Sequence, residues 1–203
     1  MAKRRKLKKA RIEKPEPERK KRIWSFRDPH NLLPWVLGAL ALFAGVFAFD
    51  SRLSLSGDNA EFIILGRSVA EGHGLTYVNT PDMRSATKYP FGFPFLLAIV
   101  HLLNPHSVLS MKLLVLFAFV VSIPLLYRYV LRETSLLVAT LVAVMAITCH
   151  FVLDYSHQVM SEIPYLLVSI LALLALESAV RHPTRRSLAL AVLAVMAAYY
   201  IRS

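Results

Sequence analysis

Long apolar blocks separated by short polar segments dominate the chain, and each block holds a continuous stretch without any charged side chain. A bilayer span needs roughly 20 mainly apolar residues, so the pattern predicts five membrane-spanning helices. The sequence therefore predicts an all-α polytopic membrane protein. The predicted spans cover about residues 32–49, 108–127, 135–153, 163–180 and 187–203.

A sixth apolar run, residues 91–103, has only 13 residues. Runs of this length are more often interfacial or buried than spanning. Lys and Arg concentrate in cytoplasmic loops, and the basic clusters near Arg128 and Arg185 fall on the side of the N-terminal tail only if 91–103 does not cross. We therefore expect 91–103 to be a helix in the outer membrane interface. It belongs to an outer loop, residues 50–107, that begins with a second short helix at 58–71.

Composition supports the membrane assignment and locates the charge. The chain is 56% hydrophobic with a mean hydropathy of +0.49, above the 45–50% apolar content of soluble domains. Of the net charge of +11, most comes from residues 1–28, which hold 13 Lys or Arg and 4 Asp or Glu. Residues 1–30 are predicted to be a disordered, basic cytoplasmic tail that contacts anionic lipid head groups. Residues 31–203 form the membrane module, and we expect no nucleic-acid partner because no nucleic-acid-binding fold pattern is present.

Acidic residues in the outer loop are the first candidates for chemistry, because ionisable groups at membrane level often mark a site. Asp58 and Glu61 stand three apart and would share one face of a helix, as a general base and its supporting acid. The same Asp-x-x-Glu spacing is close to a helix capping box, and the two roles are compatible. Glu162 follows Ser161 and lies two residues before Pro164. It has the same two interpretations: a site carboxylate or a favourable helix start.

Lys88-Tyr89 opens an unusual aromatic and proline-rich run, KYPFGFP. Lys88 could hold a phosphate as a point charge, or it could anchor the chain at the membrane interface. Asp154 and His157 lie one helical turn apart, so they could be two ligands of a divalent cation. A polar interfacial loop explains them equally well. The single cysteine, Cys149, excludes an internal disulfide and a Cys-based zinc site. No nucleotide-binding loop and no HExxH or GxSxG motif is present.

Five motifs in fixed order carry a resemblance to a known family: GDNAE, EGHGLTY, KYPFGFPFLLA, SHQVMSEIPY and YYIRS. Together they resemble membrane glycosyltransferases of the GT-C fold, in the family-39-like branch that contains protein O-mannosyltransferases and lipid A aminoarabinose transferases. The resemblance covers about residues 32–203. It implies a multi-span helical module whose first outer loop carries two juxtamembrane helices, placed in the cell (inner or plasma) membrane with the active site on the outer face.

The resemblance also implies an activity and roles for residues. The donor would be a polyprenyl-phosphate sugar and the acceptor a hydroxyl of a lipid, glycan or protein. Asp58 matches the family's base, Glu61 the second acid of the pattern, and Glu162 an acid at the start of the fourth span. Basic positions near the donor phosphate match Lys88 and Arg202. The remaining substrate-site candidates are Tyr89, Asp154 and His157.

Family members have more spans than this chain, so we expect it to be the N-terminal part of such a module. Two other functions stay open. A transporter or flippase for lipid-linked sugars would place charges near the bilayer midplane, whereas most charges here lie near span ends. A non-catalytic membrane assembly protein would not need the acidic outer loop. No motif in the sequence predicts a cofactor or a metal site.

Overall fold

The computed structural model describes residues 29–53 and 57–202, with side chains from Leu32 onward. Within these ranges the chain forms eight helices and no β-strand beyond a single bridge between Thr76 and Ser85. Residues 1–28 of the predicted tail lie outside the described residues, so the tail stays a prediction. The helices are α1 (Pro29–Phe47), α2 (Asn59–Ala70), α3 (Gly92–Leu103), α4 (Val108–Leu131), α5 (Leu136–Thr148), α6 (His150–Ser156), α7 (Glu162–Arg181) and α8 (Arg185–Ile201).

The all-helical fold is confirmed, and two of its helices, α4 and α7, are long and apolar enough to cross a membrane. The pair α5 and α6 makes a third candidate if it counts as one span, but it is bent by 59°. The predicted continuous helix over 135–153 is therefore broken at Cys149, which adopts an extended conformation. The hydroxyl of Thr148 bonds back to the carbonyl of Val144, a contact that often bends helices. Among the described residues α1 counts only as a shorter apolar helix.

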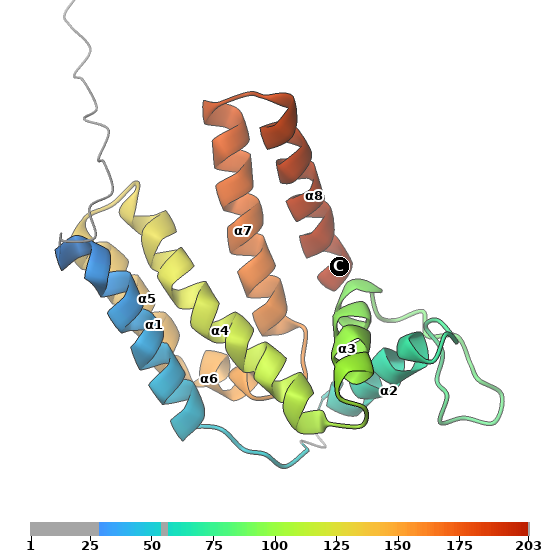
Figure 1. The fold of residues 1–203 in the computed structure, drawn as a ribbon. Helices are drawn as coiled ribbons and strands as arrows, with labels where there is room; N and C mark the ends of the chain where they lie inside the picture. Colours follow the sequence, from blue (N-terminus) through green and yellow to red (C-terminus); the bar gives the residue numbers. More distant parts are fainter. Residues whose placement is uncertain (1–28, 54–56, 203) are drawn as a thin grey trace, which may run out of the picture.

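Helices α1 and α4 run antiparallel along their whole contact. The Trp35 ring lies 5.4 Å from the guanidinium of Arg128 at one end. At the other end a Cβ on Gly45 would come within 2.5 Å of Leu116 Cδ1, the end of a flexible side chain that would then have to shift. Antiparallel packing means that α2 and α3, which connect the two helices, begin and end at the same end of the molecule (Figure 1). The structure thus agrees with the prediction that 91–103 does not cross between them.

The basic clusters gather at the opposite end from α2 and α3. Arg132, after α4, pairs with Glu177 of α7 at 2.6 Å. Arg181, at the end of α7, pairs with Glu133 at 2.9 Å and with Glu177 at 2.6 Å. These ion pairs join the α4–α5 and α7–α8 connections at the end where α1 also begins (Figure 1). The arrangement matches the prediction that the later basic clusters share one side.

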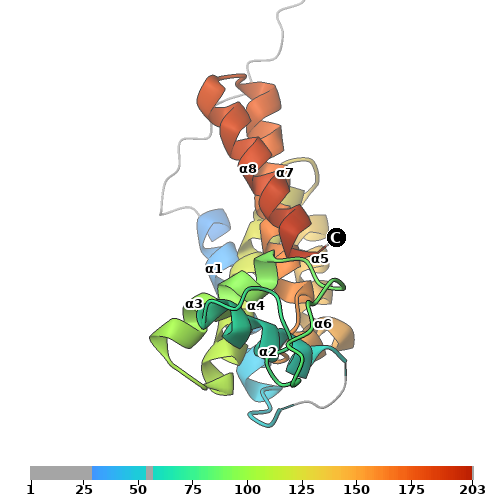
Figure 2. The ribbon, with the colours of Figure 1, turned by 90° about the vertical axis from the view of Figure 1, so that its right-hand side faces the viewer.

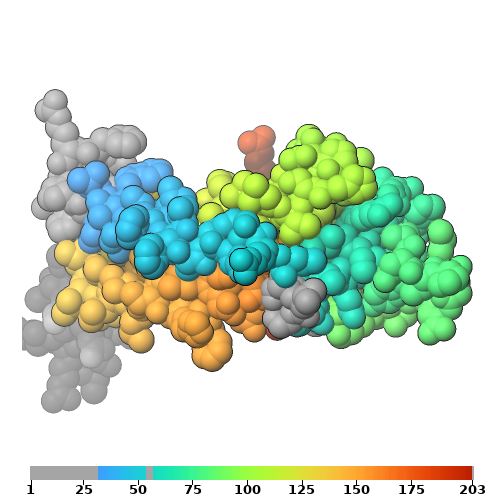
Figure 3. All heavy atoms as spheres, turned by 90° about the horizontal axis from the view of Figure 1, so that it is seen from below, coloured from blue at the N-terminus to red at the C-terminus, as the bar shows by residue number. Residues whose placement is uncertain are grey.

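Helices α2 and α3 pack against each other beside the C-terminal end of α8 (Figure 2). The rings of Phe62 and Phe93 meet edge to face with centroids 4.9 Å apart. One turn further, a Cβ on Gly66 would lie 2.7 Å from Leu97 Cβ, so the backbones can approach only because position 66 is glycine. Both predicted short helices therefore exist. Viewed from below, they form one end of a continuous surface that also includes the end of α1 (Figure 3).

Candidate functional site

Asp58 is the N-cap residue of α2, but its side chain makes no capping hydrogen bond. Its carboxylate instead accepts a hydrogen bond from Lys88 Nζ at 3.1 Å. The backbone before it turns at Gly57, whose φ of +66° favours glycine. The helix therefore starts at Asp58 without using the carboxylate, which faces the Lys88 segment.

Lys88 connects three groups that the sequence singled out. Besides Asp58, its ammonium lies 4.0 Å from Glu61 Oε2 and donates a hydrogen bond of 2.6 Å to the hydroxyl of Tyr89. The Tyr89 ring packs against Phe62 with centroids 4.8 Å apart, which holds the KY segment on α2. Glu61 Oε2 is buried and has no hydrogen-bond partner among the described residues. Within the described part of the chain, this oxygen therefore faces the Lys88 ammonium without accepting a hydrogen bond.

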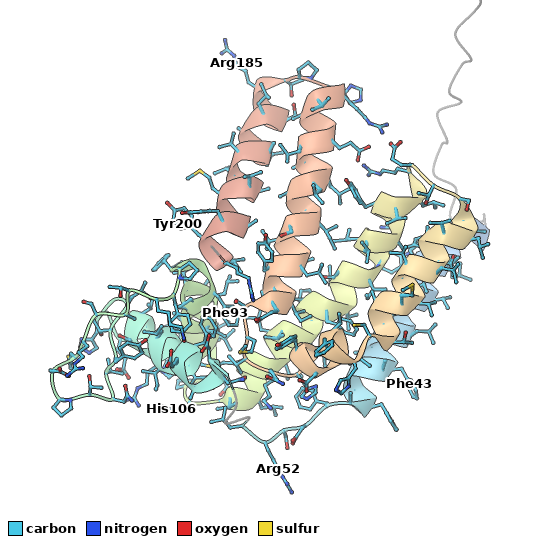
Figure 4. The ribbon with its side chains drawn as sticks, turned by 180° about the vertical axis from the view of Figure 1, so that it is seen from behind. Phe43, Arg52, Phe93, His106, Arg185 and Tyr200 are labelled. Carbon is cyan, nitrogen blue, oxygen red and sulfur yellow. The ribbon has the colours of Figure 1, made fainter. Side chains whose placement is uncertain are left out.

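A second ion pair comes from the other end of the chain. Arg202 follows α8 and its Nη1 lies 2.5 Å from Glu162 Oε1, the first residue of α7. Ser161, the N-cap residue of α7, makes no side-chain capping bond. The backbone of α8 reaches this place because α3 starts with Gly92, where a Cβ would come 2.6 Å from the carbonyl oxygen of Tyr200. Figure 4 shows Phe93 and Tyr200 near each other, with Arg185 at the far end of α8.

The charges of the two pairs act on one another. Burial raises the pKa of Asp58, but hydrogen bonds from Tyr89 and Lys88 and the positive charges of Lys88 and Arg202 outweigh it, so this pKa lies below its usual value. The hydrogen bond to Asp58 raises the pKa of Lys88 despite some desolvation. Burial, followed by the nearby Glu61 and Asp58, raises the pKa of Tyr89 well above its usual range. At neutral pH Asp58 is therefore ionised, Lys88 is an ammonium and Tyr89 is a neutral phenol.

Asp154 and His157 lie beside the site without joining either ion pair. Asp154 accepts a hydrogen bond of 2.9 Å from Gln158, and the amide oxygen of Gln158 accepts one of 3.2 Å from Asn59. His157 Nδ1 faces the carbonyl of Leu153 at 3.1 Å. No group of three potential metal ligands occurs among the described residues. A divalent cation therefore remains an untested alternative, without a ligand set to place it.

Four site residues escaped the sequence reasoning. Asn59 is fully buried, and its side chain also accepts a hydrogen bond of 2.7 Å from the Val159 backbone, which fastens the α6–α7 loop to the start of α2. Tyr77 stands close enough to Glu61, Lys88 and Asp58 for their charges to act on its pKa, which is raised mainly by burial. Asn59 and Tyr77 both lie inside the motifs quoted above, and this was the only sign in the sequence that they belong to the site. The other two are Gln158 and Lys112.

Lys112 holds the connection between α1 and α2 in place. Its side chain is 1% exposed near the start of α4, and its Nζ donates to the backbone carbonyls of Asp50, at 2.7 Å, and Arg52. Hydrogen bonds from a charged donor are the stronger kind. The lysine therefore fixes residues 50–52, which follow α1.

Comparison with known proteins adds no relative. The chain matches no protein-family model, no curated protein and no solved structure.

Proposed function

We propose that this chain is the N-terminal part of a GT-C glycosyltransferase of the family-39-like branch, which moves a sugar from a polyprenyl-phosphate carrier to an acceptor hydroxyl. One observation carries the proposal. Residues from four distant motifs meet at one site: Asp58 with Lys88, and Glu162 with Arg202. A site with carboxylates beside two cations suits a reaction that removes a proton and releases a phosphate.

The chemistry assigns each group a task. The acceptor oxygen attacks the anomeric carbon while its proton passes to Asp58, with Glu61 and Glu162 as supporting acids. The bond between the anomeric carbon and the phosphate oxygen breaks, and the phosphate leaves with the electron pair. Lys88 and Arg202 neutralise the charge that develops on it. The acceptor would be a lipid, a glycan or a protein hydroxyl.

The proposed membrane arrangement uses five passes: α1, α4, the bent α5–α6 pair, α7 and α8. Helix α8 supports a lipid-facing role because its exposed side chains are mostly large and apolar. Lys and Arg favour the cytoplasmic side, so the end with the α4–α5 and α7–α8 connections is placed inside. The basic tail then faces anionic lipid head groups of the cytoplasmic leaflet, and α2–α3 with the site face outward. The compartment is the cell (inner or plasma) membrane.

The first prediction concerns this topology. Cysteine replacing Asp82, in the loop between α2 and α3, should react with a membrane-impermeant thiol reagent added outside intact cells, once Cys149 is replaced by Ala. Cysteine replacing Arg185 should react only after the membrane is opened, because the basic cluster belongs inside. Equal labelling of both positions from outside would contradict the arrangement.

The second prediction tests the donor phosphate. Lys88→Met should lower sugar transfer from a polyprenyl-phosphate sugar about 100-fold in the intact protein, the lower end of the usual cost of losing one such group, because Arg202 remains near the leaving phosphate. The measurement is the transfer rate at equal membrane abundance. Arg84→Met is the matched control, since Arg84 is a cation of the same loop that pairs with Asp82 at 2.5 Å. Unchanged transfer by Lys88→Met would remove Lys88 from the donor site.

A further inference from the structure

Both cations of the site are already neutralised by the carboxylates beside them. Lys88 Nζ is 3.1 Å from Asp58 and 4.0 Å from Glu61, and Arg202 Nη1 is 2.5 Å from Glu162. Three carboxylates therefore face two cations. A phosphate that entered this arrangement unchanged would meet a surplus of negative charge and N–H groups that are already engaged.

The Lys88–Asp58 ion pair is exposed enough to open, whereas the Glu162 side chain of the second pair is only 24% exposed. The side chain of Lys88 is 64% exposed and that of Asp58 is 37% exposed. Ion pairs with this exposure typically contribute no more than about 1 kcal/mol, so a competing anion can displace the carboxylate at little cost. The Tyr89 hydroxyl also accepts a hydrogen bond from Lys88, at 2.6 Å, and can keep the ammonium in place when Asp58 leaves.

We infer that the site works by ion-pair exchange: a phosphate takes Lys88 from Asp58 and Arg202 from Glu162, and so frees both carboxylates. The inference rests on the proposed function, in which the phosphate belongs to the donor lipid. No covalent bond changes in this step. Donor binding thereby makes Asp58 a better base, because the Lys88 ammonium that stabilises its ionised form moves to the phosphate.

A fixed framework is the opposing view, and it predicts the opposite effect of mutation. If the carboxylates only orient the cations, removing a carboxylate should disorder Lys88 or Arg202 and weaken phosphate binding. If carboxylate and phosphate compete, removing the carboxylate should strengthen phosphate binding. The sign of the change therefore separates the two views.

The test is equilibrium binding of farnesyl phosphate to the purified, intact protein in detergent micelles. Asp58→Asn should bind it about two- to fivefold more tightly than the wild type, the factor that corresponds to an exposed ion pair. Glu162→Gln should also bind more tightly, which provides a second variant from another helix. The double variant Asp58→Asn with Lys88→Met should lose this increase in affinity for farnesyl phosphate.

Asp82→Asn is the matched control, because it opens the Asp82–Arg84 ion pair on the same loop. It should leave the affinity unchanged. Weaker or equal binding by both Asp58→Asn and Glu162→Gln, with normal wild-type binding, would overturn the exchange and leave the proposed function standing. An equal gain in Asp82→Asn would also overturn it, as a general charge effect. Failure of the wild type to bind farnesyl phosphate would contradict the proposed function itself.

Discussion

Asp58→Asn should abolish most sugar transfer, by about 100- to 10,000-fold, which is the usual contribution of a general base. An amide cannot accept the acceptor's proton at neutral pH. Asparagine is as good an N-cap residue as aspartate, and the Asp58 side chain makes no capping bond, so helix α2 should be unaffected. The measurement is transfer from a polyprenyl-phosphate sugar by the intact protein, at equal membrane abundance.

Two comparisons sharpen this result. Glu61→Gln should cost less, because Glu61 has the supporting role. In Asp58→Asn the donor should still bind at least as well as in the wild type, so the loss should fall on the catalytic rate and not on KM. Near-normal transfer by the asparagine variant would remove Asp58 as the base and leave Glu162 or Asp154 as the next candidate.

Gly92→Ala should lower transfer about 100-fold although residue 92 bears no functional group. An added Cβ would come 2.6 Å from the carbonyl oxygen of Tyr200 and 2.9 Å from the Ile201 nitrogen. The clash is with backbone, so the end of α8 must move away from α3 and take Arg202 with it. Displacing a site group by about 1 Å can cost 100-fold in rate.

The matched control for this substitution is Gly38→Ala in α1. There a Cβ would meet only Pro124, at 3.8 Å, which is an ordinary contact. This variant should transfer sugar normally and match the wild type in thermal unfolding, whereas Gly92→Ala should unfold at a lower temperature. Equal transfer by the two variants would show that the contact between α3 and α8 does not position Arg202.

The sequence by itself determined the helical class and much of the local structure. Hydropathy is a property of neighbouring residues, so the apolar blocks predicted where helices lie. The positions of basic residues predicted that 91–103 does not cross the membrane. The antiparallel packing of α1 and α4 agrees with this prediction. The motifs contained the residues that meet at the site.

Only the tertiary structure decided how those residues pair. The family resemblance implied that Lys88 and Arg202 would lie near a donor phosphate. It did not indicate that each already pairs with a carboxylate, because ion pairs depend on distances between segments up to 40 residues apart. The break at Cys149 was not predicted, because the block around it carries no charged residue, proline or glycine. The buried links of Lys112 and Asn59 were missed for the same reason: a polar side chain can be buried when another segment supplies its partner, and composition cannot name that partner.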